Sequence, residues 1–177
     1  MVRYISLLLF VGLAWGQNEY NIKHIVDQDS VYKKKFSDEI VNGNIYQMTD
    51  DMKIPLGKMK NGKKDGLWTE WYPNKRKLEE TYKHGMLDGS VSLYYKTGQK
   101  EWRHTYNNGQ FEGLWTYWYE NGQKMREGNF MCGDSTGKWI WWDKNGRVEK
   151  EKKYKNRKNA IWENYNEYVL IEVVTEP

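Results

Sequence analysis

The sequence predicts an all-β fold: an elongated antiparallel meander of tandem β-hairpin repeats, with a capping strand at each end. Three features of the sequence predict this fold. Glycines recur with a fixed period, turn-forming pairs recur between them, and aromatic residues make up 16% of the chain. A period of this kind is typical of arrays in which each repeat is one supersecondary unit that buries its apolar surface against its neighbours.

The repeat is clearest in a stretch that begins with glycine and runs into aromatic residues. The first glycine of each copy recurs every 23 to 24 residues, at Gly62, Gly85, Gly109 and Gly133. A second glycine follows four residues later, at Gly66, Gly89, Gly113 and Gly137. A degenerate copy that starts near Gly43 precedes these four clear repeats, so the array is expected to cover residues 43–157.

Each copy contains two turn signals. Asn-Gly between two β runs favours a two-residue type I′ turn, which needs positive φ at both central residues. Asn121-Gly122 fits this pattern, whereas Lys75 stands where later copies have the turn glycine. The glycine pairs four residues apart are expected to form the return loops between hairpins. The predicted turn glycines are Gly62, Gly66, Gly85, Gly89, Gly109, Gly113, Gly122, Gly133, Gly137 and Gly146.

Side chains alternate across a strand, so each aromatic run places large rings on both faces of the sheet. Trp68 and Glu70 are expected on one face, with Trp71 on the other. One ring row is predicted to form the core, and the other is either structural too or a partly exposed contact surface. The candidate interaction surface comprises Glu70, Trp71, Leu93, Tyr94, Tyr117, Trp118, Trp141 and Trp142.

The two ends of the chain differ from the array. Residues 1–16 have the charged start, short apolar run and small residues of a secretory signal peptide, with cleavage between Gly16 and Gln17. The protein is therefore expected to be exported, either to the periplasm or to the medium. Residues 17–42 are predicted to form an N-terminal extension or cap, and residues 158–177 a C-terminal capping strand.

The composition narrows the classes of partner. Ten tryptophans and 14 tyrosines are more rings than disordered chains carry, so aromatic rings supply most of the area available for burial. The formal net charge is only +4, and the lysines are spread along the chain. Neither nucleic acid nor a membrane surface is therefore an expected partner.

The sequence contains no residue pattern for catalysis, a cofactor or a metal. The single cysteine, Cys132, excludes an internal disulfide, and three histidines do not make a metal set. Glu70 with Glu79 or Glu80 could flank a sugar as acid and base, but no second feature selects these carboxylates. The prediction is a protein that is not an enzyme.

The repeat resembles the MORN repeat, in the bacterial variant of YwqK-type proteins. The motif G-x-W-x-x-W-Y-x-N-G-x-K is written here by residues 113–124, and the second repeat departs from it at Val91 and Thr97. This resemblance implies a non-catalytic β-repeat scaffold for protein or membrane contacts. The namesake group is similar to antitoxins that neutralise a toxin by binding it.

Three functions remain open from the sequence. The first is an exported scaffold for protein–protein interaction, which includes an antitoxin-like or immunity-like role. The alternative is a carbohydrate-binding or cell-wall-binding module that uses exposed aromatic rings. The third is contact with a membrane surface, which the weak net charge disfavours.

Overall fold

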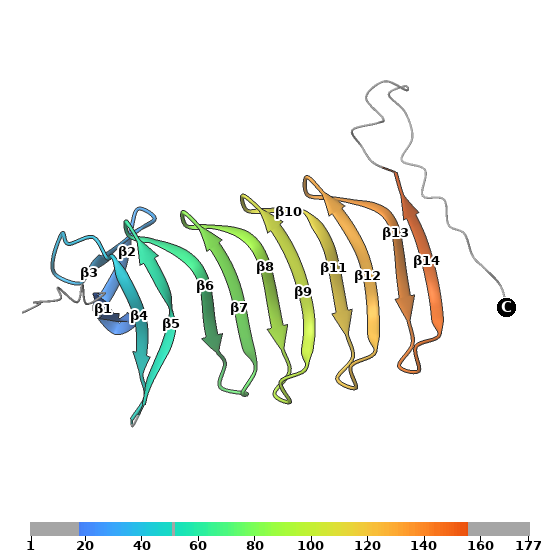
Figure 1. The fold of residues 1–177 in the computed structure, drawn as a ribbon, viewed down its shortest axis with the longest axis horizontal. Coiled ribbons are helices and arrows are strands. Elements are labelled where there is room, and N and C mark those ends of the chain that lie inside the picture. The colour runs from blue at the N-terminus through green and yellow to red at the C-terminus, as the bar shows by residue number, and fades with distance from the viewer. Residues whose placement is uncertain (1–17, 51, 156–177) are drawn as a thin grey trace, which may run out of the picture.

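The computed structural model describes residues 18–50 and 52–155. The predicted signal peptide, its cleavage position at Gly16 and Gln17, and the predicted closing strand at residues 158–177 lie outside the described residues. The meander of hairpins is confirmed: from β4 to β14, successive strands pair antiparallel along one open sheet (Figure 1).

Twelve strands form this main sheet. In chain order they are β1 (Glu19–Asn21), β4 (Gly43–Met48), β5 (Lys53–Lys60), β6 (Lys63–Trp71), β7 (Lys77–Lys83), β8 (Met86–Tyr94), β9 (Lys100–Asn107), β10 (Gln110–Phe111), β11 (Gly113–Trp118), β12 (Lys124–Met131), β13 (Asp134–Trp142) and β14 (Val148–Tyr154). The short strand β10 pairs only with β9, and β1 pairs parallel to β4.

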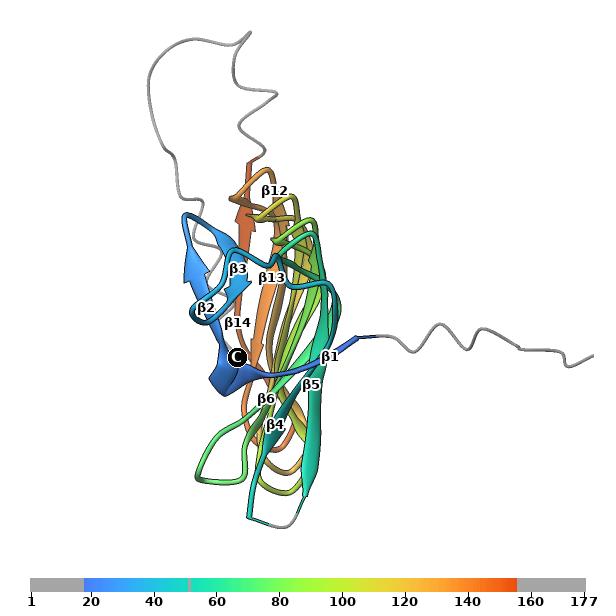
Figure 2. The same ribbon diagram turned by 90° about the vertical axis from the view of Figure 1, so that its left-hand side faces the viewer.

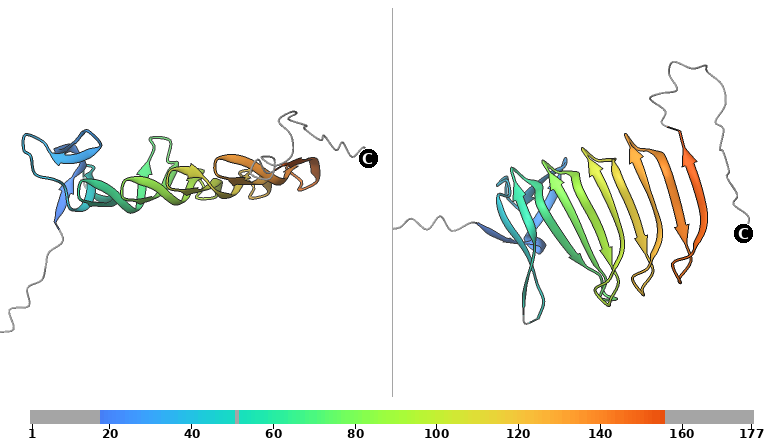
Figure 3. Two further views of the ribbon diagram at one scale, coloured as in Figure 1. Left: turned by 90° about the horizontal axis from the view of Figure 1, so that it is seen from above. Right: turned by 45° about the vertical axis from the view of Figure 1, so that its right-hand side comes forward.

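A small hairpin lies on one side of the sheet at its N-terminal end (Figure 2). It consists of β2 (Ile25–Gln28) and β3 (Val31–Lys34), which follow the 3₁₀ turn η1 (Ile22–His24). Viewed from above, the rest of the sheet is a single layer, and the loop between β6 and β7 projects on the same side as this hairpin (Figure 3).

Buried side chains join the small hairpin to the sheet. The cluster that connects them consists of Ile25, Val41, Ile45, Met59 and Trp68. Of the two predicted ring rows, the one that contains Trp68 is the core, since Trp68 is 5% exposed whereas Trp71 is 54% exposed. The N-terminal hairpin therefore covers one end of the face that bears Trp68.

The turns correct one prediction from the sequence. All ten predicted turn glycines have positive φ, but the three-residue loop at Asn121-Gly122 has positive φ only at Gly122 (86°). There the Gly122 N–H donates to Tyr119 O at 2.9 Å, which places a left-handed glycine after an ordinary turn. The two-residue turns with positive φ at both positions are the return loops, such as Cys132-Gly133 (52° and 87°).

Each repeat is tied to its neighbour at both rims of the sheet. At one rim, the turn glycine N–H donates to a carbonyl of the preceding repeat, as in Gly109 N to Leu87 O (2.7 Å). At the other rim, a tyrosine hydroxyl donates to a carbonyl of the following repeat, from Tyr95 to Trp118 O (2.9 Å) and from Tyr119 to Trp142 O (3.0 Å).

Candidate functional site

The two faces of the sheet differ in chemistry. We call one the aromatic face: its rings are Trp68, Tyr82, Trp102, Tyr106, Phe111, Trp115, Tyr117, Phe130, Trp139, Trp141 and Tyr154. We call the other the charged face: its row includes Trp71, Lys77, Glu79, Tyr94, Thr116, Trp118, Lys124, Glu127 and Trp142. Every ring–ring contact found in the described part of the chain lies on the aromatic face.

The candidate interaction residues divide equally between these faces. Glu70, Leu93, Tyr117 and Trp141 lie on the aromatic face, in register with Leu78, Trp102 and Arg126 on the intervening strands. Trp71, Tyr94, Trp118 and Trp142 lie on the charged face. The eight residues therefore belong to two separate surfaces.

Two repeats seat their buried ring on a glycine. A Cβ added at Gly57 would lie 2.6 Å from the Trp68 ring, and one added at Gly128 would lie 2.0 Å from the Trp139 ring. The indole N–H of Trp68 donates to Lys58 O at 3.0 Å, and that of Trp139 donates to Asn129 O at 3.3 Å. We call each such pair of positions a ring slot. It consists of the position of the buried ring on one strand and the position beneath that ring on the preceding strand.

In the ring slot of the third repeat, a histidine takes the place of the glycine and lies beneath Trp115. His104 is 7% exposed and lies between two indoles, with ring centroids 3.6 Å from Trp115 and 4.2 Å from Trp102. Burial, and secondly the charge of Arg126, lowers the pKa of His104 to about 4. The imidazole is therefore neutral at physiological pH, and neither His104 Nε2 nor Trp115 Nε1 has a hydrogen-bond partner.

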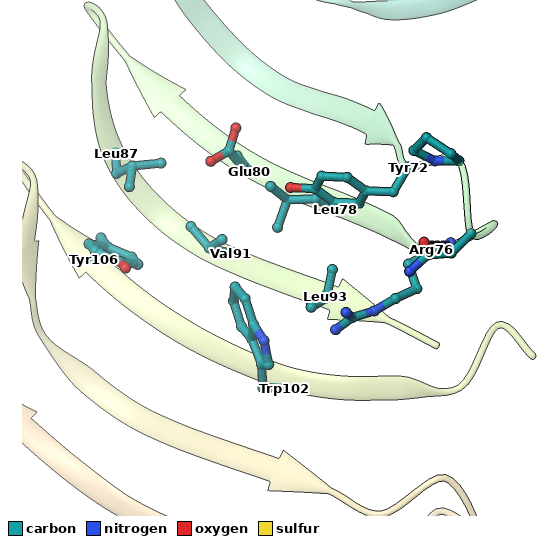
Figure 4. A pocket seen from close by; sticks show the side chains of 11 residues that line it. Tyr72, Arg76, Leu78, Glu80, Leu87, Val91, Leu93, Trp102 and Tyr106 are labelled. Carbon is teal, nitrogen blue, oxygen red and sulfur yellow. Dashed lines mark hydrogen bonds between the residues drawn. The ribbon is translucent and has the colours of Figure 1, made fainter. Parts of the chain in front are cut away.

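The second repeat leaves its ring slot without a ring, because Val91 stands opposite Glu80. A hollow of about 550 Å³ opens on the aromatic face there, within the size range of ligand pockets. We call it the second-repeat hollow (Figure 4). Its apolar lining comes from Leu78, Leu87, Val91 and Leu93, and its larger side chains are Tyr72, Trp102, Tyr106, Arg76 and Glu80.

The polar groups of the hollow are held by specific partners. The Tyr82 hydroxyl donates to Glu80 at 3.0 Å, and Lys64 Nζ lies 3.8 Å from the same carboxylate. Arg76 forms an ion pair with Glu101. Figure 4 shows the Tyr72 ring beside Leu78 with its hydroxyl directed toward Glu80; burial, and then the charges of Glu70 and Glu80, raise the pKa of Tyr72.

On the charged face, lysines and glutamates alternate with rings. Lys77 lies 2.7 Å from Glu79, which also accepts a 2.7 Å bond from the Tyr94 hydroxyl. Burial raises the pKa of Glu79, but these two hydrogen bonds and the charges of Lys77 and Lys100 together outweigh burial and hold the pKa below its usual range. Burial and Glu79 together raise the pKa of Tyr94 to about 12. Lys124 and Glu127 repeat the ion pair at 2.7 Å.

The carboxylates considered as acid and base do not form one group. Glu70 and Glu80 share the aromatic face, while Glu79 lies on the charged face. No group of three or more potential metal ligands occurs within residues 18–50 and 52–155. In the same residues, no helix is long and apolar enough to cross a membrane.

A comparison with family models identifies the repeats. A model described as a MORN repeat variant matches residues 64–84, 111–131 and 135–156. Three segments of the chain are therefore similar to MORN repeats. Such repeats are generally non-catalytic modules linked to binding. The unmatched stretch between the first two MORN segments contains Val91 and the strand β8. No curated protein matches the chain significantly.

Most residues of the second-repeat hollow were missed by sequence reasoning. Leu93 was a candidate, but Tyr72, Leu78, Trp102 and Tyr106 were not. The available signal was the departure of Val91 from the repeat, because a missing ring at a buried position leaves space. The sequence shows this departure from the motif at Val91, but it does not show whether a neighbouring side chain fills the space.

Proposed function

We propose that this MORN repeat protein is an exported, non-catalytic scaffold that binds a partner protein through its aromatic face. The observation that carries the proposal is the second-repeat hollow, an apolar and ring-lined cavity on that face. Protein interfaces concentrate aromatic side chains at well-packed centres. Export rests on the sequence of residues 1–16 alone.

The surroundings of the hollow support a partner larger than a small molecule. The N-terminal hairpin and the β6–β7 loop project on the same side of the sheet (Figures 2 and 3). Beyond the hollow, the row of Tyr117 and Trp141 extends along the aromatic face, with Arg126 lying 3.9 Å over the Tyr117 ring. A partner seated in the hollow would therefore meet further rings and a cation along the same row.

Substitutions of two adjacent aromatic residues test which face of the sheet binds the partner. Tyr117 and Trp118 are neighbours on β11, both half-buried, and point to opposite faces. With the chain as bait on envelope and culture-medium extracts, Tyr117→Ala should lose a stoichiometric protein that the wild type and Trp118→Ala both retain. Loss with Trp118→Ala alone would move the binding site to the charged face, and equal recovery with both variants would contradict the proposal.

The finer role is antitoxin-like or immunity-like binding, as the YwqK-type resemblance implies. The captured protein decides this role, since it must contain a domain that is toxic when produced alone. Co-production with this chain should then restore growth, while co-production with Tyr117→Ala should not. A captured partner without toxicity would leave the scaffold function and remove the antitoxin role.

One observation favours glycan binding as a second candidate function. Trp71, Tyr94, Trp118 and Trp142 recur on the charged face at every second strand, a spacing of about 10 Å from the usual distance between paired strands. Rings in such a row can stack on alternate sugars of a linear glycan. Soluble cell-wall fragments should then quench tryptophan fluorescence, and Trp71→Ala should reduce the quenching more than Leu67→Ala on the same strand and face.

A further inference from the structure

The second-repeat hollow lies where each of the other clear repeats places its own tryptophan side chain. In register, Val91 corresponds to Trp68, Trp115 and Trp139, each of which puts an indole on the aromatic face. The second repeat keeps the same strand pairing, with Glu80 opposite Val91. The backbone is thus arranged as in the neighbouring repeats, and what the site lacks is the ring.

We infer that the second-repeat hollow receives an indole side chain presented by the partner protein. The ring would lie on Val91 and between Leu78 and Trp102, where the repeat's own tryptophan would otherwise lie. Its N–H would donate to the Glu80 carboxylate, which has acceptor capacity beyond its hydrogen bond from Tyr82 and its ion pair with Lys64. This inference rests on the proposed function, because it names the chemistry of the partner's anchor.

The lining selects an indole over other large side chains. Four aliphatic side chains favour an apolar body, and the Glu80 carboxylate can accept one further hydrogen bond. An indole offers both an apolar body and a donor, without an acceptor that would face the carboxylate. Trp102 and Tyr106 add ring surfaces for edge or stacked contacts. A leucine or phenylalanine would offer no donor to this carboxylate and would therefore lack a hydrogen bond to a charged group.

Methyl NMR of the full-length protein tests the site with a defined probe. N-acetyl-tryptophanamide should shift the methyl signals of Leu78, Leu87, Val91 and Leu93, with a dissociation constant of about 1 mM, as expected for one small fragment. The methyls of Leu67 and Leu114, which lie on the opposite face, should not move. Equal shifts on both faces, or equal binding of N-acetyl-leucinamide, would overturn the inference.

The indole N–H can be tested separately. Indole should bind about tenfold more tightly than 1-methylindole, which has no donor, because a hydrogen bond to a charged group is lost. Glu80→Ala should remove this difference between the two probes. If both probes bind the wild type equally, Glu80 does not receive the indole N–H and the proposed orientation is wrong.

A substitution that fills the hollow provides the decisive variant. Val91→Trp supplies the indole of the other repeats and should abolish binding of N-acetyl-tryptophanamide. Leu87→Phe, which copies Phe111 of the third repeat, narrows the hollow by a smaller change and should weaken binding if Val91→Trp does not fold. Leu114→Trp, an added indole on the opposite face, is the matched control and should bind the probe as the wild type does.

The same variant separates this inference from the proposed function. If Val91→Trp loses the captured partner while Leu114→Trp retains it, both the inference and the proposed function are supported. If Val91→Trp retains the partner and Tyr117→Ala loses it, the indole inference is overturned while the scaffold function stands. If the probe binds in the hollow but no protein is captured, the inference that a partner protein supplies the indole is overturned.

Discussion

The second and fourth repeats pair corresponding residues, Leu78 with Leu93 and Arg126 with Trp141, but differ at the ring slot. In the fourth repeat, Trp139 lies on Gly128, its indole N–H is bonded to a backbone carbonyl, and the site is filled. In the second repeat, Val91 lies opposite Glu80 and a hollow remains. The comparison teaches that the two positions of a slot vary together: the indoles of the first, third and fourth repeats lie on a glycine or a flat ring, whereas Val91 of the second repeat lies opposite Glu80.

The third repeat shows the flat-ring solution. His104 takes the place of glycine, and Trp115 stacks on it at 3.6 Å instead of lying against the backbone. The indole N–H of Trp115 then has no partner, unlike those of Trp68 and Trp139. Aromatic stacking in this repeat therefore replaces a hydrogen bond.

The largest expected effect comes from making the fourth repeat resemble the second. Trp139→Val should lower the free energy of unfolding by about 3 kcal/mol, because a buried ring is lost. Gly128→Ala alone should cost about 2 kcal/mol, since its Cβ would overlap the Trp139 ring. In the Trp139→Val background, Gly128→Ala should cost little, and a double-mutant cycle from urea denaturation measures this coupling.

The exposed ring on the opposite face provides the control. Trp71→Val is the same substitution on the charged face, where Trp71 is more than half exposed, and should change stability by about 1 kcal/mol or less. If Gly128→Ala and Trp139→Val were simply additive, the two positions of a slot would be independent.

The next effect concerns pH and separates the third repeat from the others. The pKa of His104 is lowered to about 4 from 6.5 by burial and by Arg126, so the unfolded chain binds a proton that the folded protein excludes. This contribution to stability is complete above pH 6.5 and is lost as the pH falls toward 4. The loss should be on the order of 2 kcal/mol, measured by denaturation at a series of pH values.

Two variants isolate this dependence from the carboxylates that titrate in the same range. His104→Phe keeps a flat ring in the slot and should flatten the slope between pH 6.5 and 4. The matched control is His84→Asn, which removes a histidine at an exposed turn position where the first and third repeats have asparagine. An identical slope in wild type and His104→Phe would exclude a neutral buried imidazole.

The smallest effects test the turns that are common to the repeats. Gly122 has φ of 86°, and Gly122→Val should cost about 2 kcal/mol because a β-branched residue is strained there. Lys75 occupies the corresponding position in the first repeat with φ of 64°, so Lys75→Gly should raise stability by about 0.5 kcal/mol, the strain relief less the entropy cost of glycine. Thermal denaturation of the two variants measures the expected decrease in stability for Gly122→Val and the expected increase for Lys75→Gly. Unchanged stability of Gly122→Val would contradict the turn assignment.

The meander was predictable because its signals are local and repeated. Glycine spacing located the turns, and strand alternation placed Trp68 and Trp71 on opposite faces, as the structure confirms. The turn types were less predictable, because Asn-Gly fits both a two-residue turn and the longer loop found at Gly122. Which form occurs depends on strand register, which one repeat alone does not specify.

The candidate site was predictable only in part, for a different reason. Strand alternation separates adjacent candidates such as Glu70 and Trp71 onto opposite faces. It does not join the four residues of each face into one row, since that requires the pairing of neighbouring strands. The hollow depends on Tyr72, Trp102 and Tyr106, which come from different strands and meet only through the register of the sheet. Its single local signal was the absence of a ring at Val91.

The bonds at the two rims have a consequence for how the molecule can change in length. Each joins equivalent positions one repeat apart, from Gly85 N to Lys64 O and from Gly109 N to Leu87 O. Excising residues 85–108 would bring Gly109 to the place of Gly85, where its N–H meets the same carbonyl of Lys64. Whole repeats are therefore interchangeable segments, and a lineage can lengthen, shorten or lose the hollow by a single in-frame duplication or deletion.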